Sequence, residues 1–414
     1  MIKVTLMKTG SLNIIRKNAI GIWQPGLRTF KPVFTGRISL FRTYRIAASV
    51  FFFIAGLTFS TWASRIPDIQ NKLNLSDGGL GAVLFALPVG LMVSLPLSGW
   101  LVSRFGSRKM VITGALFYPL LLIPLPLADS VLQLTIALFL FGIASNLVNI
   151  AMNTQAVGVE KLYGRSVMAS FHGLWSLAVF AGALTGTFFV SNGLSPIVHF
   201  TIVSAAACLL VLLAYKFTLP KDKDRGQTHR AFAKPDKRIF LLGLIAFCCM
   251  LCEGAMADWS GVYFKKIVSA PVSLTTLGYV AFSSTMALGR FIGDWLVVKT
   301  GTKKMLQISG IIITTGLLIA VCFPYLASST AGFLLVGFGV SSVVPVVYGI
   351  SGRSSNMSAS AALAAVSTIG FLGFLVGPPL IGIVAQAISL RWSFALVAFL
   401  GFGTTLLAGK LKNE

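Results

Sequence analysis

SGWLVSRFGSRKM, at residues 98–110, is a short basic stretch between two long apolar runs. A second stretch, GDWLVVKTGTKKM at residues 293–305, repeats its Trp, Leu, Gly, basic pair and Met at a constant offset of 195 residues. That offset is close to half of the 414-residue chain. A repeat this long indicates two duplicated halves. Each stretch is therefore predicted to be a tight turn between two helices of its own half.

The composition indicates a protein that faces lipid. Hydrophobic residues make up 56% of the chain and charged residues 11%, and the mean hydropathy is +0.86. A water-facing exterior needs more polar cover than this, so most of the apolar surface is expected to lie in a bilayer. The net charge of +23 would suggest nucleic acid in a soluble protein. The placement of the charges excludes that partner here.

Twelve apolar runs are long enough to cross the hydrocarbon, which takes about 20 residues of helix. Because lipid cannot satisfy open backbone groups, the expected fold is an all-α membrane protein of twelve transmembrane helices in two six-helix, pseudo-symmetric halves. The predicted spans are 46–64, 79–102, 110–128, 131–155, 168–190, 196–216, 238–262, 274–298, 305–326, 330–350, 359–386 and 390–409.

Polar segments divide the chain into four parts. Residues 1–43 carry eight Lys or Arg and no acid, which predicts a basic cytoplasmic tail or an upstream extension. The two halves are expected at 44–216 and 238–414. The polar interval 217–237 between them is the predicted cytoplasmic linker.

Lys and Arg gather on one side of the predicted spans. That side holds 28 of them and the opposite loops hold 5, with Arg290 inside a span. The positive-inside rule places the basic side in the cytoplasm, together with both termini. The chain is therefore expected to be a multi-pass membrane protein.

Two carboxylates lie in the span at 238–262. Glu253 is past its middle, and Asp258 is nearer the outer end. A charged acid at mid-membrane costs roughly 2.5–3.5 kcal/mol on insertion scales, so Glu253 must take a proton, pair with a cation or form an interhelical hydrogen bond. Both acids are candidates for proton coupling, although Asp258 also fits a rim carboxylate.

Polar side chains in the fourth and fifth spans are candidates for substrate binding. Asn146, Asn149 and Asn153 share one helix face by their i, i+3, i+7 spacing, and amides suit hydroxyl-rich or zwitterionic solutes. Bonding between helices explains them equally well. His172 and Trp175 follow at the start of the fifth span. Trp62 and Trp259 occupy similar places in spans 1 and 7, where anchoring at the membrane interface is favoured over stacking on a sugar.

The remaining intramembrane features are predicted to be structural. Arg290 and Asp294 are four residues apart, so they can pair on one helix face as a structural or gate-locking pair. Gly182 and Gly186, and Gly373 and Gly377, have the small-x-x-x-small spacing of close helix contacts. Cys249 and Cys252 have the CxxC spacing, but inside a span they indicate packing rather than a metal site, and no cofactor is expected.

The two basic turns resemble a loop that is characteristic of the major facilitator superfamily. Gly99, Leu101, Arg104, Gly106, Arg108 and Lys109 follow its pattern between helices 2 and 3, and Gly301 belongs to a degenerate copy between helices 8 and 9. The chain departs from the pattern at Ser103, where the family usually has Asp. Stretches around Asn149, His172 and Glu253 also resemble the YbjJ-type bacterial subgroup, which is distantly similar to fucose permeases.

The resemblance implies transport by alternating access around a midplane site. The prediction is a proton-coupled transporter of a small polar solute, by symport, as a monomer with protons and the lipid bilayer as its other partners. Two alternatives stay open: a proton-antiport exporter of amphipathic compounds, and a non-transporting sensor. An enzyme is not expected, since the chain has no GxSxG, HExxH or P-loop motif.

Overall fold

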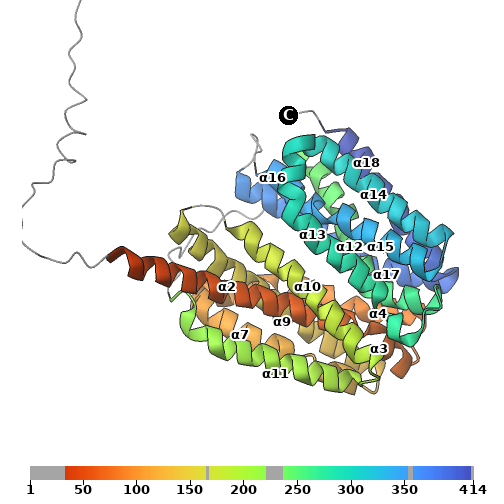
Figure 1. Ribbon diagram of the computed structural model, residues 1–414, viewed down its shortest axis with the longest axis horizontal. Coiled ribbons are helices and arrows are strands. Elements are labelled where there is room, and N and C mark those ends of the chain that lie inside the picture. The colour runs from red at the N-terminus through yellow and green to blue at the C-terminus, as the bar shows by residue number, and fades with distance from the viewer. Residues whose placement is uncertain (1–32, 165–166, 221–235, 353–357, 412–414) are drawn as a thin grey trace, which may run out of the picture. The chain divides into compact units, whose positions relative to one another are not determined.

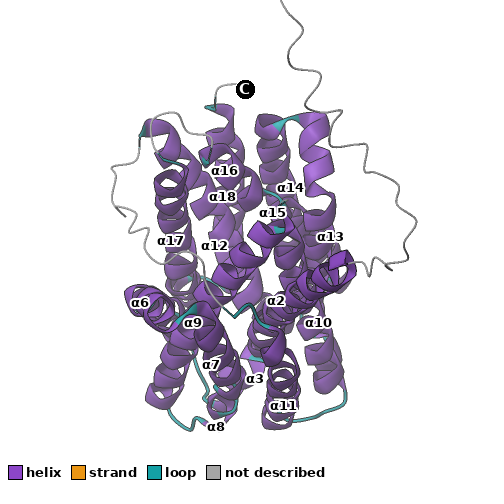
Figure 2. Cartoon of the chain, turned by 90° about the vertical axis from the view of Figure 1, so that its left-hand side faces the viewer, coloured by secondary structure: helices purple, strands orange, loops and turns teal. Residues whose placement is uncertain are grey.

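A computed structural model describes residues 33–164, 167–220, 236–352 and 358–411, and of these the side chains of residues 33–39, 294, 359 and 360 are not described. The chain divides into two compact units, Met1–Leu40 and Phe41–Glu414. Most of the predicted tail at 1–43 and of the predicted linker at 217–237 therefore lies outside the described residues. Every regular element in the described ranges is helical (Figure 2).

The first six predicted spans correspond to a series of helices in the second unit (Figure 1). They are α2 (Val33–Ala63), then α4 (Asp77–Leu84), α5 (Ala86–Val93) and α6 (Leu95–Phe105) for the second span, α7 (Ser107–Leu120) with α8 (Pro124–Leu127) for the third, α9 (Val131–Tyr163), α10 (Met168–Ser191) and α11 (Pro196–Ala214). A short helix, α3 (Ile66–Lys72), follows α2, and the 3-10 turn η1 (Tyr215–Phe217) follows α11.

The last six predicted spans correspond to the remaining helices. They are α12 (Lys237–Lys266), α13 (Leu277–Thr300), α14 (Thr302–Cys322), α15 (Leu326–Ser341) with α16 (Val343–Ser351), α17 (Ala359–Ala387) and α18 (Leu390–Gly409), with the 3-10 turn η2 (Val272–Leu274) before α13. Ten of the described helices are long and apolar enough to cross a membrane, and a bent pair makes eleven. The 24-residue α13 occupies the remaining place in the twelve-helix fold.

The second and tenth spans are interrupted, which the sequence reading did not predict. Breaks fall at Phe85, Ser94 and Ser342. Pro88 and Pro345 lie three residues after two of these breaks, and Pro96 lies two residues after the third. Proline has no N–H to donate to the carbonyl of the preceding turn, so the helix is locally unpaired where each break occurs.

The two basic turns have the same backbone geometry, as the repeat predicts. Gly106 has φ 86° and ψ 148°, and Gly301 has φ 80° and ψ 154°. In both turns the glycine N–H donates to the carbonyl four residues earlier, at 2.9 Å from Val102 and 2.8 Å from Val297. Only glycine adopts this left-handed region at low cost, which explains why it recurs at this position.

Contacts between helices also repeat between the first six spans and the last six. The helix α5 packs on α9, as α13 packs on α15. In the same way α7 packs on both α9 and α11, as α14 packs on both α15 and α18. The same arrangement of neighbouring helices therefore occurs twice in the chain, once among the first six spans and once among the last six.

Small residues set the distance between the first and fifth spans and between the seventh and eleventh. A Cβ at Gly182 of α10 would lie 2.7 Å from the Ser60 Cβ of α2. A Cβ at Gly373 of α17 would lie 2.5 Å from the Phe247 carbonyl oxygen of α12. Both contacts need a residue without a side chain, which confirms the predicted packing role at these positions. At Gly377 a Cβ would come no closer than 3.7 Å to Leu251, so the close contact does not extend to that glycine.

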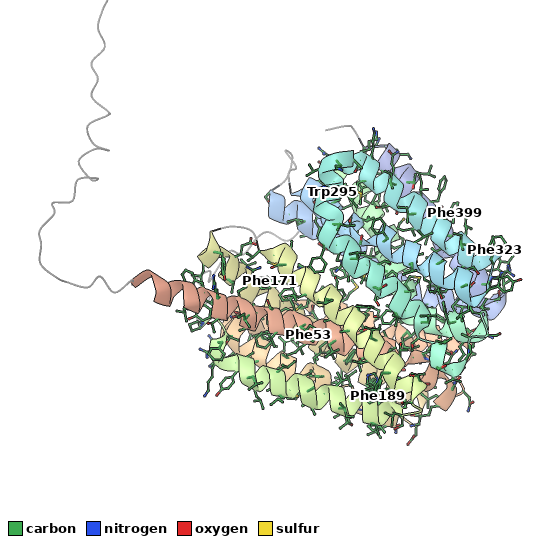
Figure 3. The ribbon with its side chains drawn as sticks, viewed as in Figure 1. Phe53, Phe171, Phe189, Trp295, Phe323 and Phe399 are labelled. Atoms are coloured by element: carbon green, nitrogen blue, oxygen red, sulfur yellow. The ribbon has the colours of Figure 1, made fainter. Side chains whose placement is uncertain are left out.

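Large apolar side chains cover the outside of the described bundle. Trp295, Phe323 and Phe399 are 57%, 58% and 69% exposed, whereas Phe171 is fully buried (Figure 3). Exposed apolar surface on this scale is not tolerated by a protein in water, and it is matched by lipid tails.

Candidate functional site

The described elements of the two halves meet at several places. The helix α10 contacts α13 and the turn η2, α17 contacts α4 and α5, and α3 contacts α12. We call the side with the turns at Gly106 and Gly301 the basic face, and the side with the α2–α3 and α12–η2 connections the opposite face.

The halves are joined tightly at the opposite face. Lys266 Nζ pairs with Asp77 Oδ1 at 2.6 Å, and the Gly78 N–H donates to Gln386 Oε1 at 3.3 Å. A Cβ at Gly81 would lie 2.6 Å from the Pro378 carbonyl oxygen. A solute cannot pass between backbones that are this close, so the opposite face is closed along the α4–α17 contact.

Arg290 of α13 is the centre of a polar cluster between the halves. Its Nη1 donates to Ser176 Oγ of α10 at 2.7 Å, and its guanidinium carbon lies 5.4 Å from the centre of the Trp175 ring. Its Nη2 faces Glu253 Oε1 of α12 at 3.5 Å. The side chains of Arg290 and Glu253 are only 17% and 13% exposed, so the two charges lie beside each other with little access to water.

This ion pair differs from the one that the sequence suggested. Arg290 was expected to pair with Asp294 on its own helix, and the side chain of Asp294 lies outside the described part of the chain, so that pairing stays a prediction. The partner that the structure gives, Glu253, is 37 residues away on a neighbouring helix. Spacing along one helix carries no signal for such a contact, and the bond to Ser176, 114 residues away, was missed for the same reason.

Asp258 lies one to two turns beyond Glu253 on α12. It is half-buried, and within the described ranges no hydrogen bond or ion pair of its carboxylate is found. A partly buried carboxylate without a partner is a costly feature in a membrane helix. Both predicted proton-coupling residues are therefore on α12, one with a cationic partner and one without a described partner.

A small pocket opens beside Arg290. It has a volume of about 180 Å³ and is lined by residues of α13, α14, α15 and α16 and by Ser342 at the break between α15 and α16. Arg290 is the only charged side chain among the described residues that line it. Hydroxyl groups come from Thr302, Ser341 and Ser342, so the pocket offers one cation and several hydrogen-bonding groups.

The three asparagines of α9 divide into two groups. Asn146 is buried, and its Nδ2 donates to Ser94 Oγ at 3.0 Å and to Ser98 Oγ at 3.2 Å. These bonds fix α9 to the second span, which is the interhelical role that the sequence left open. Asn153 Nδ2 donates to the Asn149 side chain at 2.8 Å, and both residues are half-buried. Only this second pair keeps amide groups on a partly accessible face.

His172 and Trp175 lie on α10 close to the Arg290 cluster. His172 is exposed and meets the Phe52 ring edge-on, with ring centres 5.3 Å apart. Trp175 stacks on Phe59 at 6.5 Å in addition to its contact with Arg290. Trp175 therefore touches the charged pair directly, whereas His172 is held by an aromatic neighbour.

The preference for Trp62 and Trp259 as interface anchors was wrong. The two side chains are 1% and 0% exposed, so neither reaches the membrane interface. Their Nε1 atoms are buried and have no hydrogen-bond partner among the described residues. Apolar neighbours along the chain suit both a lipid-facing ring and a buried one. The position of a Trp in a span therefore does not predict whether its side chain is exposed.

The residues of the basic turn have structural roles where the structure shows their contacts. Arg108 Nη2 lies 3.4 Å from the Tyr215 carbonyl of η1, while Arg104 and Lys109 are exposed. A Cβ at Gly99 would meet nothing within 4 Å. The buried Gln155 was not assigned a structural role, yet its Nε2 donates to Ser107 Oγ at 2.6 Å at the start of α7.

A larger cavity at the opposite face has the properties of a structural site. It has a volume of about 430 Å³ and includes Arg65 and Asp68. The Arg65 guanidinium already donates to Asp68 Oδ2 at 2.8 Å, to the Leu194 carbonyl at 2.8 Å and to His199 Nδ1 at 3.3 Å. Each of its three nitrogens donates a hydrogen bond within the N-terminal half, so Arg65 stabilises the connections there.

Comparisons with known proteins agree with this architecture. The family model of the Major Facilitator Superfamily matches residues 48–361 and 271–412. An uncharacterized MFS-type transporter of Yersinia pestis is 34% identical over 86% of this chain and 92% of its own. An uncharacterized transporter of Sinorhizobium fredii is 32% identical over 87% of this chain and 96% of its own.

A solved structure gives the same fold. The crystal structure of a D-xylose–proton symporter superposes with a TM-score of 0.72 over 89% of this chain and 97% of its own, at 15% identity. The matched family model, the relatives and the twelve-helix arrangement together lead to one conclusion: this chain belongs to the Major Facilitator Superfamily and is a membrane transporter of that kind.

Proposed function

We propose that this protein is a secondary transporter that moves a small polar solute together with protons by alternating access. The observation that carries the proposal is the Arg290–Glu253 pair, which is buried within α12 and α13 and is bonded across the two halves to Ser176. The structural likeness to a D-xylose–proton symporter supports a proton-coupled mechanism.

The contact between Arg290 and Ser176 links chemistry to movement. Because Arg290 belongs to the C-terminal half and Ser176 to the N-terminal half, rocking of the halves must lengthen or break this 2.7 Å hydrogen bond. Protonation of Glu253 removes the counter-charge of Arg290 and so changes the free energy of the cluster. Glu253 is the proposed proton carrier, and Asp258 is a second site for a proton on the same helix.

The closed opposite face defines the state of the transport cycle. With Gly81 packed on Pro378 and Lys266 paired with Asp77, the solute would reach the Arg290 pocket from the basic face.

We infer from the Lys and Arg bias that the basic face is cytoplasmic and that the membrane is the bacterial inner membrane, with the transporter acting as a monomer. We also propose that the chain belongs to the YbjJ-type subgroup of the superfamily.

Transport in proteoliposomes with an imposed pH gradient tests the function. A panel of sugars, sugar acids and amines is added outside, and internal pH reports proton movement. A solute that moves protons only when protein is present establishes coupling, and the sign of the pH change separates symport from antiport. If no solute moves protons in a preparation of folded, inserted protein, the proposed coupling is wrong.

Glu253→Gln tests the role of the acid. The variant keeps the shape of the side chain, and it is expected to bind solute yet to lose uptake driven by the pH gradient. Asp129→Asn is a matched control, because the Asp129 side chain is 81% exposed and pairs only with Lys72 at the opposite face. Full pH-driven uptake by Glu253→Gln would exclude Glu253 as the proton carrier.

A further inference from the structure

The pocket beside Arg290 carries an inference about the class of solute, which rests on the proposed function. We propose that the transported solute is a small hydroxylated monocarboxylate whose carboxylate binds the Arg290 guanidinium while Glu253 takes up one proton. The solute and the proton then load together with no change in the net charge of the site.

The geometry of the ion pair leaves Arg290 able to accept a second anion. A guanidinium has five N–H donors, and a favourable Arg–carboxylate pair has two parallel bonds of about 2.7–2.9 Å. Arg290 instead has one contact of 3.5 Å to Glu253 and one bond of 2.7 Å to a neutral hydroxyl. Its Nε has no partner among the described residues. Glu253 therefore balances the charge of Arg290 through one contact only. The paired N–H groups that bind a carboxylate in a bidentate manner are not occupied by Glu253.

The pocket wall is suited to an anion rather than a cation. Arg290 supplies a positive charge, and no Asp or Glu is among the described lining residues. Glu253 itself is not part of that lining. A cationic solute in this pocket would meet the positive guanidinium with no acidic group among the described lining residues, whereas a carboxylate would gain a charge-assisted hydrogen bond.

The remaining lining indicates a small solute with hydroxyl groups. Ser341 and Ser342 contribute side-chain oxygens 3.4 Å apart, and Thr302 contributes a third hydroxyl. The volume of about 180 Å³ is below the roughly 300–1,000 Å³ of typical drug-sized pockets. A compact hydroxy acid or sugar acid fits both the chemistry and the size better than an extended amphipathic compound.

Charge balance explains why the proton and the anion would bind together. A buried Arg that loses the counter-ion beside it is destabilised, so protonation of Glu253 alone is unfavourable. The carboxylate of an incoming solute replaces the Glu253 carboxylate as the counter-ion of Arg290. When the solute leaves, Glu253 loses its proton and becomes the counter-ion again. Other ionisable groups near the pair are His172 of α10, Cys249 and Asp258 of α12, Tyr279 of α13 and Tyr348 of α16.

The test uses matched pairs of acids and their neutral counterparts: gluconate and glucitol, galacturonate and galactose, and glycerate and glycerol. Binding to the purified full-length protein is measured by the shift in melting temperature and, in proteoliposomes, by solute uptake. The acid of at least one pair is expected to bind, more tightly at acidic than at alkaline pH, and its neutral counterpart is expected not to bind.

Three variants separate the roles of the two charges. Arg290→Gln is expected to weaken binding of the acid at least tenfold, as truncation of a buried charge partner does. Glu253→Gln is expected to keep or strengthen binding and to remove its pH dependence. The double variant Arg290→Gln with Glu253→Gln removes both charges of the described pair. It should therefore fold even if Arg290→Gln does not, and it should still fail to bind the acid. Lys299→Gln is the control, because Lys299 lies over the Trp295 ring away from the pocket.

Two results would overturn the inference. The first is that no acid of the panel shifts the melting temperature at any pH. The second is that a neutral solute binds and its affinity is unchanged in Arg290→Gln. If a neutral solute is then transported with protons, the proposed function stands and only the solute class is wrong. If no solute moves protons while an acid binds through Arg290, the solute class stands and the coupling is wrong.

Discussion

At the scale of single residues, polar side chains inside the bundle either join helices or remain available to a ligand. Asn146 joins helices, since both bonds of its amide nitrogen go to serines of the second span. Arg290 joins the two halves and lines a pocket. Both residues are polar side chains in an apolar run. What distinguishes their roles is the location of the groups to which they bond.

Asn146→Ala is expected to lower stability without changing transport by the folded protein. Hydrogen bonds between membrane helices contribute about 0.6 kcal/mol on average and up to about 1.7 kcal/mol, and two bonds of Asn146 are lost. The melting temperature of the purified variant measures the effect. Asn153→Ala is the comparison, because Asn153 bonds only within α9. A loss of substrate affinity in Asn146→Ala would instead show that Asn146 contributes to substrate binding.

At the scale of helices, glycines decide how closely the spans approach. A side chain at Gly182 or Gly186 of α10 would collide with Ser60 or Ser64 of α2. Turn glycines act through backbone conformation instead: Gly106 has φ 86°, and at Gly301, with φ 80°, a Cβ would meet nothing within 4 Å. The same residue type therefore serves two purposes that sequence alone does not distinguish.

Gly186→Ala is expected to destabilise the protein by about 1–3 kcal/mol, the usual range for overpacking in a filled interface. Gly99→Ala in α6 is the control, since its Cβ would enter open space and alanine is favoured over glycine in a helix by about 1 kcal/mol. Thermal unfolding in detergent compares the two. Equal melting temperatures would show that α10 can move away from α2 at little cost.

Gly106→Ala is expected to cost about 1–2 kcal/mol, because a residue with a Cβ is disfavoured at φ 86° in the left-handed region. Gly352→Ala offers a comparison at φ −64°, where alanine is not strained. Expression level and melting temperature report the effect. If both variants melt at the same temperature, the turn can adopt another conformation.

At the scale of the whole molecule, closure of the opposite face depends mainly on backbone contact. The Lys266–Asp77 pair is partly exposed, with side-chain exposures of 37% and 16%. Pairs of this kind contribute about 0.2–1 kcal/mol. The Gly81–Gly382 contact leaves no room for a side chain, since a Cβ at Gly81 would lie 2.9 Å from the Gly382 Cα.

Asp77→Asn is expected to shift the population open at the opposite face by less than about fivefold, as a loss of up to about 1 kcal/mol permits. Gly81→Val is expected to shift it by about fivefold to 150-fold, because overpacking costs about 1–3 kcal/mol. The labelling rate of Thr276→Cys by an impermeant maleimide measures opening, since Thr276 is 1% exposed and bonds to Thr187 of the other half at 2.7 Å. Gly99→Val serves as the control, and faster labelling in Asp77→Asn than in Gly81→Val would contradict this order.

The sequence was sufficient for the properties that depend on local composition. Apolar runs of span length and the repeated turn at Gly106 and Gly301 predicted the helices and their equivalence, because hydropathy and backbone conformation are encoded locally. The contacts of Arg290 were not predictable in this way. Glu253 and Ser176 lie 37 and 114 residues from Arg290, and only the packing of three helices brings them together. Burial of Trp62 and Trp259 depends on packing in the same manner.

The Arg290–Glu253 pair also records how the two duplicated halves diverged. Under the 195-residue offset of the basic turns, Arg290 corresponds to Leu95, and under the 197-residue offset that relates Trp62 to Trp259, Glu253 corresponds to Gly56. Gly56 packs against the Trp175 backbone, so the first half has tight packing where the second has a charge. A protein built from two copies of the first half would thus have turns and glycine contacts but neither member of this ionisable pair, and under the proposed function it would lack the proton carrier.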